Sequence, residues 1–153
     1  MTLYGVLLFV HVLGAAVWLG GEVMMFGLRA LAMRGGDRAR TVALVQDTDR
    51  LSIGVISPAV TVVRAAGIAL VVKGDWGFDR FFVVFGLAGF ALSSVVGGLF
   101  TFPKGRALQK SVARGGGESD EVGRLIRRVQ QGLLVDVFLL TAIVFVMTTK
   151  PSL

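Results

Sequence analysis

Residues 3–28 read LYGVLLFVHVLGAAVWLGGEVMMFGL, an apolar run long enough to cross a lipid bilayer as one helix. The run nevertheless contains His11, Trp18 and Glu22, which are separated by seven and then by four residues. At 3.6 residues per turn, this spacing places the three side chains on one stripe of the helix. Because lipid disfavours ionisable groups, we expect the stripe to face other helices or a polar cavity.

Three further apolar runs cover about residues 51–72, 81–102 and 132–149, and the 153-residue chain is 54 % hydrophobic. Each run is close to the length of a membrane span. Backbone groups inside a bilayer must be paired within the protein, so apolar runs of this length indicate helices. The sequence therefore predicts an all-α fold, a single integral membrane domain over residues 1–153 in which four helices form a bundle.

The charges predict how this bundle is oriented in the membrane. The net charge is +6, and the basic residues gather in two of the three loops, between the first and second runs and between the third and fourth. The remaining loop has only Lys73 and Arg80. Since basic loops stay in the cytoplasm during insertion, we expect both termini outside and two basic cytoplasmic loops, in a bacterial cytoplasmic membrane. The basic loops are expected to contact anionic lipid rather than nucleic acid.

Several kinds of chemistry are not indicated. The chain has no cysteine, which excludes disulfides, thiolate metal sites, iron–sulfur clusters and thiol nucleophiles. No phosphate-binding loop, nucleophilic triad or catalytic acid pair is recognisable.

The loop residues predict where the helices end. Gly35 and Gly36 should end the first helix, and Asp37 should cap a short amphipathic stretch lying along the cytoplasmic surface. We expect the third helix to end at Pro103. The fourth helix should begin after Ser119, inside the cytoplasm, and run to Thr149.

Four ionisable residues fall inside the predicted spans, at an insertion cost of about 2.5–3.5 kcal/mol for a charge at mid-span. They are His11, Glu22, Arg64 and Asp136. Counted from the outer helix ends at about 1.5 Å per residue, His11 and Arg64 lie at a similar depth of roughly 12–13 Å. Asp136 is deeper, at roughly 20 Å, and Glu22 is expected near the inner surface.

Two interpretations remain open for each of the outer residues. Arg64 either pairs with Asp136 to fix helix packing, or binds a carboxylate such as a porphyrin propionate, for which its planar fork is suited. His11 either bonds a neighbouring helix or ligates haem or another metal. A haem held by two imidazoles would require a homodimer, because the chain has one histidine. The candidate site is therefore His11, Trp18, Arg64 and Asp136, with His11 as the metal ligand.

The stretch from His11 to Gly21, the ending Val144–Pro151 and Asp136 together resemble a bacterial family of predicted integral membrane proteins of unknown function. The resemblance covers essentially the whole chain. More distantly, the first helix resembles the copper-resistance protein D superfamily and the HemJ-type protoporphyrinogen oxidases. In those groups a histidine followed by a tryptophan recurs in helix 1, and the resemblance implies haem b with His11 as axial ligand. The chain lacks the further histidines of the HemJ type.

These observations lead to three functional hypotheses. The preferred one is a protein that binds haem or another hydrophobic redox-linked ligand, as a homodimer or as an accessory subunit of a respiratory assembly. The second is a small transporter or copper-handling permease, recognisable by a water-accessible path joining His11 to Glu22. The third is a structural or assembly protein with an Arg64–Asp136 pair and no cavity beside it.

Overall fold

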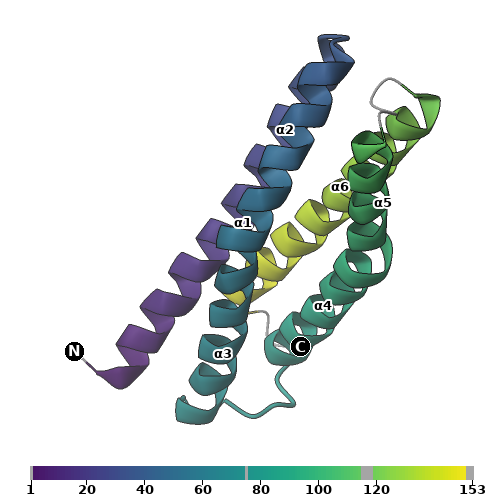
Figure 1. Cartoon of the computed structure of the whole chain (residues 1–153). Helices are drawn as coiled ribbons and strands as arrows, with labels where there is room; N and C mark the ends of the chain where they lie inside the picture. The colour runs from purple at the N-terminus through teal and green to yellow at the C-terminus, as the bar shows by residue number, and fades with distance from the viewer. Residues whose placement is uncertain (1, 75, 115–118, 151–153) are drawn as a thin grey trace.

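A computed structural model describes residues 2–74, 76–114 and 119–150, and within these ranges every regular element is helical (Figure 1). Four continuous helical rods are each long and apolar enough to span a membrane, which confirms the predicted fold class. The first rod is α1 (Leu3–Arg34) and the fourth is α6 (Asp120–Thr149). The second rod consists of α2 (Arg38–Leu51), the π-helical turn η1 (Ser52–Ile56) and α3 (Ser57–Lys73). The third rod consists of α4 (Phe81–Val95), the π-helical turn η2 (Val96–Thr101) and α5 (Phe102–Ala113).

The helix boundaries predicted from turn residues are confirmed at two junctions. Helix α1 ends at Arg34, and Gly36 adopts a φ of 73°, a conformation that glycine accommodates best. The Asp37 side chain then accepts a hydrogen bond from the Arg40 backbone N–H and caps α2. Helix α6 is capped in the same way by Ser119.

Two of the predicted boundaries are wrong, because the second and third rods extend further than their apolar runs. Helix α2 does not lie along a membrane surface but packs upright against α1 and continues into α3 (Figure 1). The third rod does not end at Pro103 but continues to Ala113. Pro103 falls in the first turn of α5, directly after η2, where the missing backbone N–H is tolerated.

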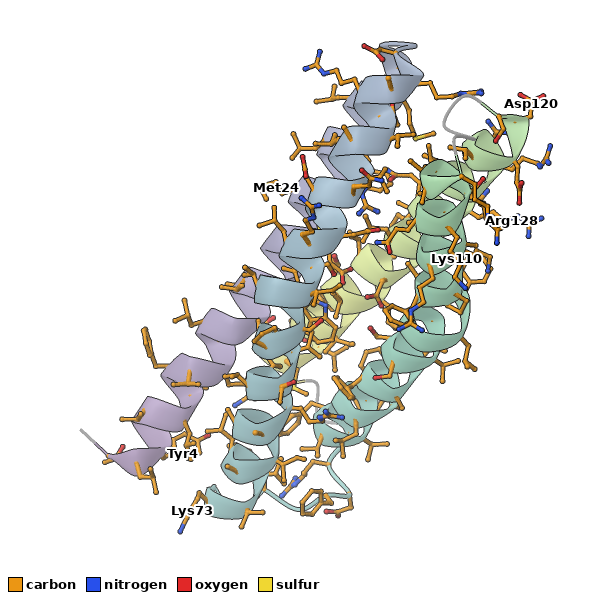
Figure 2. The ribbon with its side chains drawn as sticks, in the orientation of Figure 1. Tyr4, Met24, Lys73, Lys110, Asp120 and Arg128 are labelled. Carbon is orange, nitrogen blue, oxygen red and sulfur yellow. The ribbon has the colours of Figure 1, made fainter. Side chains whose placement is uncertain are left out.

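A second hydrophobic core explains these extensions. Val42 and Val45 of α2, Leu108 of α5, and Val122 and Ile126 of α6 form a buried cluster. Figure 2 shows charged side chains around it, with Lys110, Asp120 and Arg128 at the same end of the molecule and Tyr4 and Lys73 at the other. We call the end that contains Lys110, Asp120 and Arg128 the basic end. Its apolar-inside, charged-outside pattern is that of a water-exposed helical bundle.

Glycines set the packing of the two helical pairs. A Cβ on Gly14 would lie 2.7 Å from Val63 Cγ2, so α1 and α3 approach closely there. A Cβ on Gly89 would lie 2.7 Å from Ile143 Cδ1, which reports the same close approach of α4 and α6. Contacts between α1 and α6 join the two pairs.

Candidate functional site

Glu22 of α1 is buried between the helices. Its side chain is buried, with the residue 7 % exposed, and Oε1 accepts a hydrogen bond of 2.9 Å from Trp18 Nε1 one turn earlier. Both residues belong to the stripe predicted from the sequence, so the expectation that this stripe faces protein is confirmed for them.

Asp136 of α6 meets Glu22 of α1 inside the bundle. The two residues line the same pair of cavities, the Ser93 side chain of α4 lines one of them, and Asp136 is 9 % exposed. Glu22 Oε2 and Asp136 Oδ1 are buried, yet neither accepts a hydrogen bond from a donor in the described ranges. Buried polar atoms are nearly always paired, so these two oxygens have capacity left to accept hydrogen bonds.

Two cavities meet at this carboxyl pair. The central cavity has a volume of about 260 Å³ and lies between η1 and α3 on one side and α4 and η2 on the other. The basic-end cavity has a volume of about 520 Å³ and extends toward α2 and α5. Five residues line both: Glu22, Ser52, Gly97, Gly98 and Asp136.

The two π-helical turns supply much of the cavity wall. Ser52 comes from η1, and Gly97 and Gly98 come from η2. π-Helical turns are uncommon and occur often at functional sites, because the extra residue redirects backbone and side chains. A Cβ on Gly97 or Gly98 would have no neighbour within 4 Å, so the backbone here borders open space.

Aromatic and hydroxyl side chains complete the central cavity. The rings of Trp18 and Phe90 meet edge to face, with centroids 6.0 Å apart. Ser57 and Ser94 add hydroxyl groups to those of Ser52 and Ser93. The cavity thus combines two carboxyl groups, an aromatic wall and several groups able to donate or accept hydrogen bonds.

The ion pair between Arg29 and Asp49 lines the basic-end cavity. Arg29 of α1 contacts Asp49 at 2.8 Å through Nη2 and donates a 2.8 Å hydrogen bond from Nε to the Thr48 hydroxyl. The Arg29 side chain is 5 % exposed, whereas that of Asp49 is 20 % exposed. Arg106 and Gln109 of α5 also line this region.

The structure separates the predicted site residues into two groups. Trp18 and Asp136 line the central cavity, but His11 and Arg64 line neither of the two cavities. The Arg64 guanidinium lies 5.0 Å from the centroid of the Phe90 ring, and the described residues show no ion pair between Arg64 and Asp136. The predicted Arg64–Asp136 pair is therefore wrong, because Glu22 occupies the place beside Asp136.

His11 contacts the neighbouring helix, as one of its two interpretations expected. Its Nδ1 lies 2.9 Å from the carbonyl oxygen of Val63, and its ring packs against the backbone of Gly67. Because a carbonyl oxygen only accepts, Nδ1 carries the proton and Nε2 is the free nitrogen. No group of three or more His, Cys, Asp or Glu side chains able to hold a metal ion occurs within residues 2–74, 76–114 and 119–150.

Sequence reasoning missed the carboxyl pair, the π-helical turns and the Arg29–Asp49 pair. The available signals were the small residues Ser93, Ser94, Gly97 and Gly98, which we expected to serve helix packing. Gly86, Gly89 and Ser93 are indeed buried in α4, whereas Gly97 and Gly98 border the cavities. We recognised no acid pair in the sequence, and this prediction is wrong. The fold brings Glu22 and Asp136, from opposite ends of the sequence, to the same cavities.

In comparison with known proteins, a family model described as "Predicted integral membrane protein (DUF2269)" matches residues 5–151. No curated protein matches the chain, and no solved structure does. The match confirms the predicted integral membrane character; the more distant resemblances to copper-resistance protein D and HemJ-type proteins stay predictions.

Proposed function

The chain belongs to the DUF2269 family of predicted integral membrane proteins, and from this premise we propose that it is a small transporter for an organic ammonium ion. In this proposal the ion binds in the central cavity against Glu22 and Asp136. The observation that carries the proposal is the pair of buried carboxyl oxygens, Glu22 Oε2 and Asp136 Oδ1, that have no donor within the described ranges.

Hydrogen-bonding capacity supports a ligand with N–H donors. An ionised carboxyl group only accepts hydrogen bonds, so its natural partner is a group that donates and is positively charged. The basic residues at the cavity limit do not fill this role. Arg29 is engaged with Thr48 and Asp49, and the Arg106 guanidinium lies 4.5 Å from the centroid of the Phe102 ring.

The cavity wall supports an organic rather than a bare inorganic cation. Trp18 and Phe90 present aromatic surface beside the carboxyl groups. Aromatic rings attract ammonium groups through their negative faces, and they also pack against alkyl substituents. A central cavity of about 260 Å³ is large enough for a small organic ion together with water.

The shape of the interior supports transport over static binding. The carboxyl pair lines both the central cavity and the basic-end cavity, which extends toward α2 and α5. A polar substrate site inside the bundle, lined by interrupted helices, is a feature that transporters share. The third hypothesis, a structural role, expected an Arg64–Asp136 pair with no cavity beside it, and both expectations are unmet.

Fluorescence of Trp18 tests the proposal directly. The chain has two tryptophans, so a Trp76→Phe background leaves Trp18 as the only indole, inside the cavity. We expect ethylammonium chloride to give a saturable change in emission from detergent-solubilised protein. Tetramethylammonium, which has no N–H donor, should bind more weakly, and sodium acetate should have no effect.

Matched variants locate the site. Glu22→Gln and Asp136→Asn each remove a charge-assisted hydrogen bond, so each should weaken ethylammonium binding by about tenfold or more. Glu121→Gln is the control, because Glu121 is exposed on the same helix as Asp136 and lines neither cavity. Failure of ethylammonium to bind, or equal binding by the Asp136→Asn variant, would contradict the proposal.

The copper-handling form of the transporter hypothesis has less support. Copper(I) prefers thiolate, thioether and imidazole ligands. Among the residues that line the two cavities, Met25 is the one side chain of this kind. Copper chloride, added under reducing conditions in the same fluorescence assay, is therefore expected to leave Trp18 emission unchanged.

Haem binding is the second candidate, and one observation on His11 favours it. A metal-ligating imidazole usually donates its other N–H to a carbonyl or carboxylate group, which fixes the ring and leaves the second nitrogen for the metal. The contact of His11 Nδ1 with the Val63 carbonyl has this form. Because His11 lines neither cavity, the ligand would bind on the outer side of the α1–α3 pair, in line with the predicted homodimer or respiratory subunit.

A further inference from the structure

We propose that Glu22 and Asp136 hold a single proton between them when the cavity is empty, and that an organic ammonium ion displaces this proton on binding. The protein would then exchange one proton for one organic cation. This inference rests on the proposed function and names the ion to which transport is coupled.

The closeness of the two buried carboxyl groups favours a shared positive charge. Glu22 and Asp136 come from two helices in contact, and both residues line the same two cavities. Two ionised carboxylates this close repel each other strongly when they are shielded from water, and such pairs in proteins hold one proton in common. A proton on either group turns a repulsive contact into a hydrogen bond.

Nearby groups stabilise one negative charge on the pair but not two. Trp18 Nε1 donates to Glu22, and Ser93 lines the same cavity as Asp136. These are neutral groups, each worth less than a charged partner. Among the residues that the structure describes, no donor reaches Glu22 Oε2 or Asp136 Oδ1, and both residues are more than nine-tenths buried.

The charged side chains of the surrounding helices are occupied elsewhere. On α1 and α2, Arg29 is paired with Asp49, and on α5 Arg106 lies over Phe102. On α3, Arg64 lies over Phe90, and His11 of α1 is bonded to the Val63 carbonyl of α3. The groups that face the pair therefore leave its net charge to be set by protons or by a bound cation.

The exchange conserves the charge of the site. With one shared proton, the pair carries one negative charge. When an ammonium ion enters, it donates N–H hydrogen bonds to both carboxylates, and the proton leaves through the aqueous route of the basic-end cavity. The occupied site again carries one negative charge, so no additional charge is buried in the membrane at either stage.

Proton release during binding tests the inference in the whole protein. Detergent-solubilised protein in weakly buffered solution near neutral pH is titrated with ethylammonium, which stays protonated there, while pyranine reports free protons. We expect about one proton released per ethylammonium bound. The Glu22→Gln and Asp136→Asn variants should release none at any occupancy, and the exposed control Glu121→Gln should behave as the wild type.

Proteoliposomes supply the second measurement. An outward ethylammonium gradient should acidify the lumen of vesicles containing the wild-type protein faster than that of protein-free vesicles, in which only leakage of neutral ethylamine acidifies the lumen, and clamping the membrane potential with potassium and valinomycin should not change the rate. Wild-type protein that binds ethylammonium without releasing protons would overturn this inference and leave the proposed function standing. Wild-type protein that binds no ethylammonium would overturn both, and neither result depends on a variant folding correctly.

Discussion

The Arg29 guanidinium on α1 contacts the Asp49 carboxylate on α2 at 2.8 Å, and both residues line the basic-end cavity. The same guanidinium also donates to Thr48, whose hydroxyl in turn contacts the Leu44 carbonyl at 2.8 Å. This network ties α2 upright against α1 and forms one limit of the basic-end cavity. It is therefore both a packing element and a charged part of the cavity wall.

The first prediction concerns the stability of this network. Arg29→Ala leaves a largely buried carboxylate and a buried hydroxyl without their partner, so we expect the free energy of unfolding to fall by about 2–3 kcal/mol. Asp49→Asn keeps an acceptor for Arg29 and should cost less, about 1 kcal/mol. Reversible unfolding in mixed detergent and SDS micelles measures both. Equal losses for the two variants would show that the charge of Asp49, not its geometry, is what matters.

Helix packing gives a second prediction. A methyl group on Gly14 would meet Val63 Cγ2 at 2.7 Å, and the β-branched valine has little freedom to move away. Gly14→Ala should therefore lower the free energy of unfolding by about 1–3 kcal/mol. Gly27→Ala is the matched control on the same helix, because its Cβ would meet nothing within 4 Å. We expect it to be neutral or slightly stabilising, and a destabilised control would refute the packing argument.

The fold could be predicted largely from the sequence because hydrophobic length and turn residues act locally. Four apolar runs determine four spans, and Asp37 and Ser119 mark helix starts that the structure confirms. The extent of the second and third rods was not predictable in the same way. Helix α2 could lie along the membrane surface or pack upright against α1. Which of the two it does depends on burial of Val45 in a cluster with Leu108, a residue far away in the sequence.

The site was harder to predict because helix ends are not level in the membrane. Glu22 lies about 28 Å along α1 from Leu3, and Asp136 lies about 20 Å along α6 from Thr149. These counts place the two residues at different depths, yet both line the same two cavities. Depth counted from each helix end thus carries an error of about one and a half helical turns. Because of this error in the predicted depths, the sequence favoured Arg64 rather than Glu22 as the partner of Asp136.

The third prediction is the orientation of the protein in the membrane, which the basic loops indicate. The chain has no cysteine, so single cysteines can be placed at will. Phe78→Cys, in the short loop before α4, should react with a membrane-impermeant maleimide in intact bacterial cells. Glu121→Cys, at the basic end, should react only after the cells are permeabilised. The reverse pattern would refute the predicted topology, and the cysteine-free parent controls for non-specific labelling.

The fourth prediction tests the haem alternative. Under that hypothesis, haemin added to the purified protein gives a Soret band shifted from that of free haemin, and His11→Ala abolishes the shift. Gly67→Ala should also weaken it, because the added Cβ would lie 2.9 Å from His11 Cε1 and displace the ring. Gly27→Ala again serves as the control. Haemin binding that survives His11→Ala would contradict a role for His11 as ligand.

The fifth prediction uses the open space beside η2 to block the cavity without disturbing the fold. A side chain on Gly98 would meet no neighbour within 4 Å of its Cβ, and Gly98 lines both cavities. Gly98→Leu should therefore place an isobutyl group next to the carboxyl pair, and we expect ethylammonium binding to be lost while the unfolding midpoint changes little. Gly27→Leu is the control, since Gly27 also has free space but lines neither cavity. Because Glu22 and Asp136 are intact in Gly98→Leu, loss of binding in this variant would come from occupied volume rather than from altered charge. Unchanged binding would show that the ammonium ion does not use the space between the two cavities.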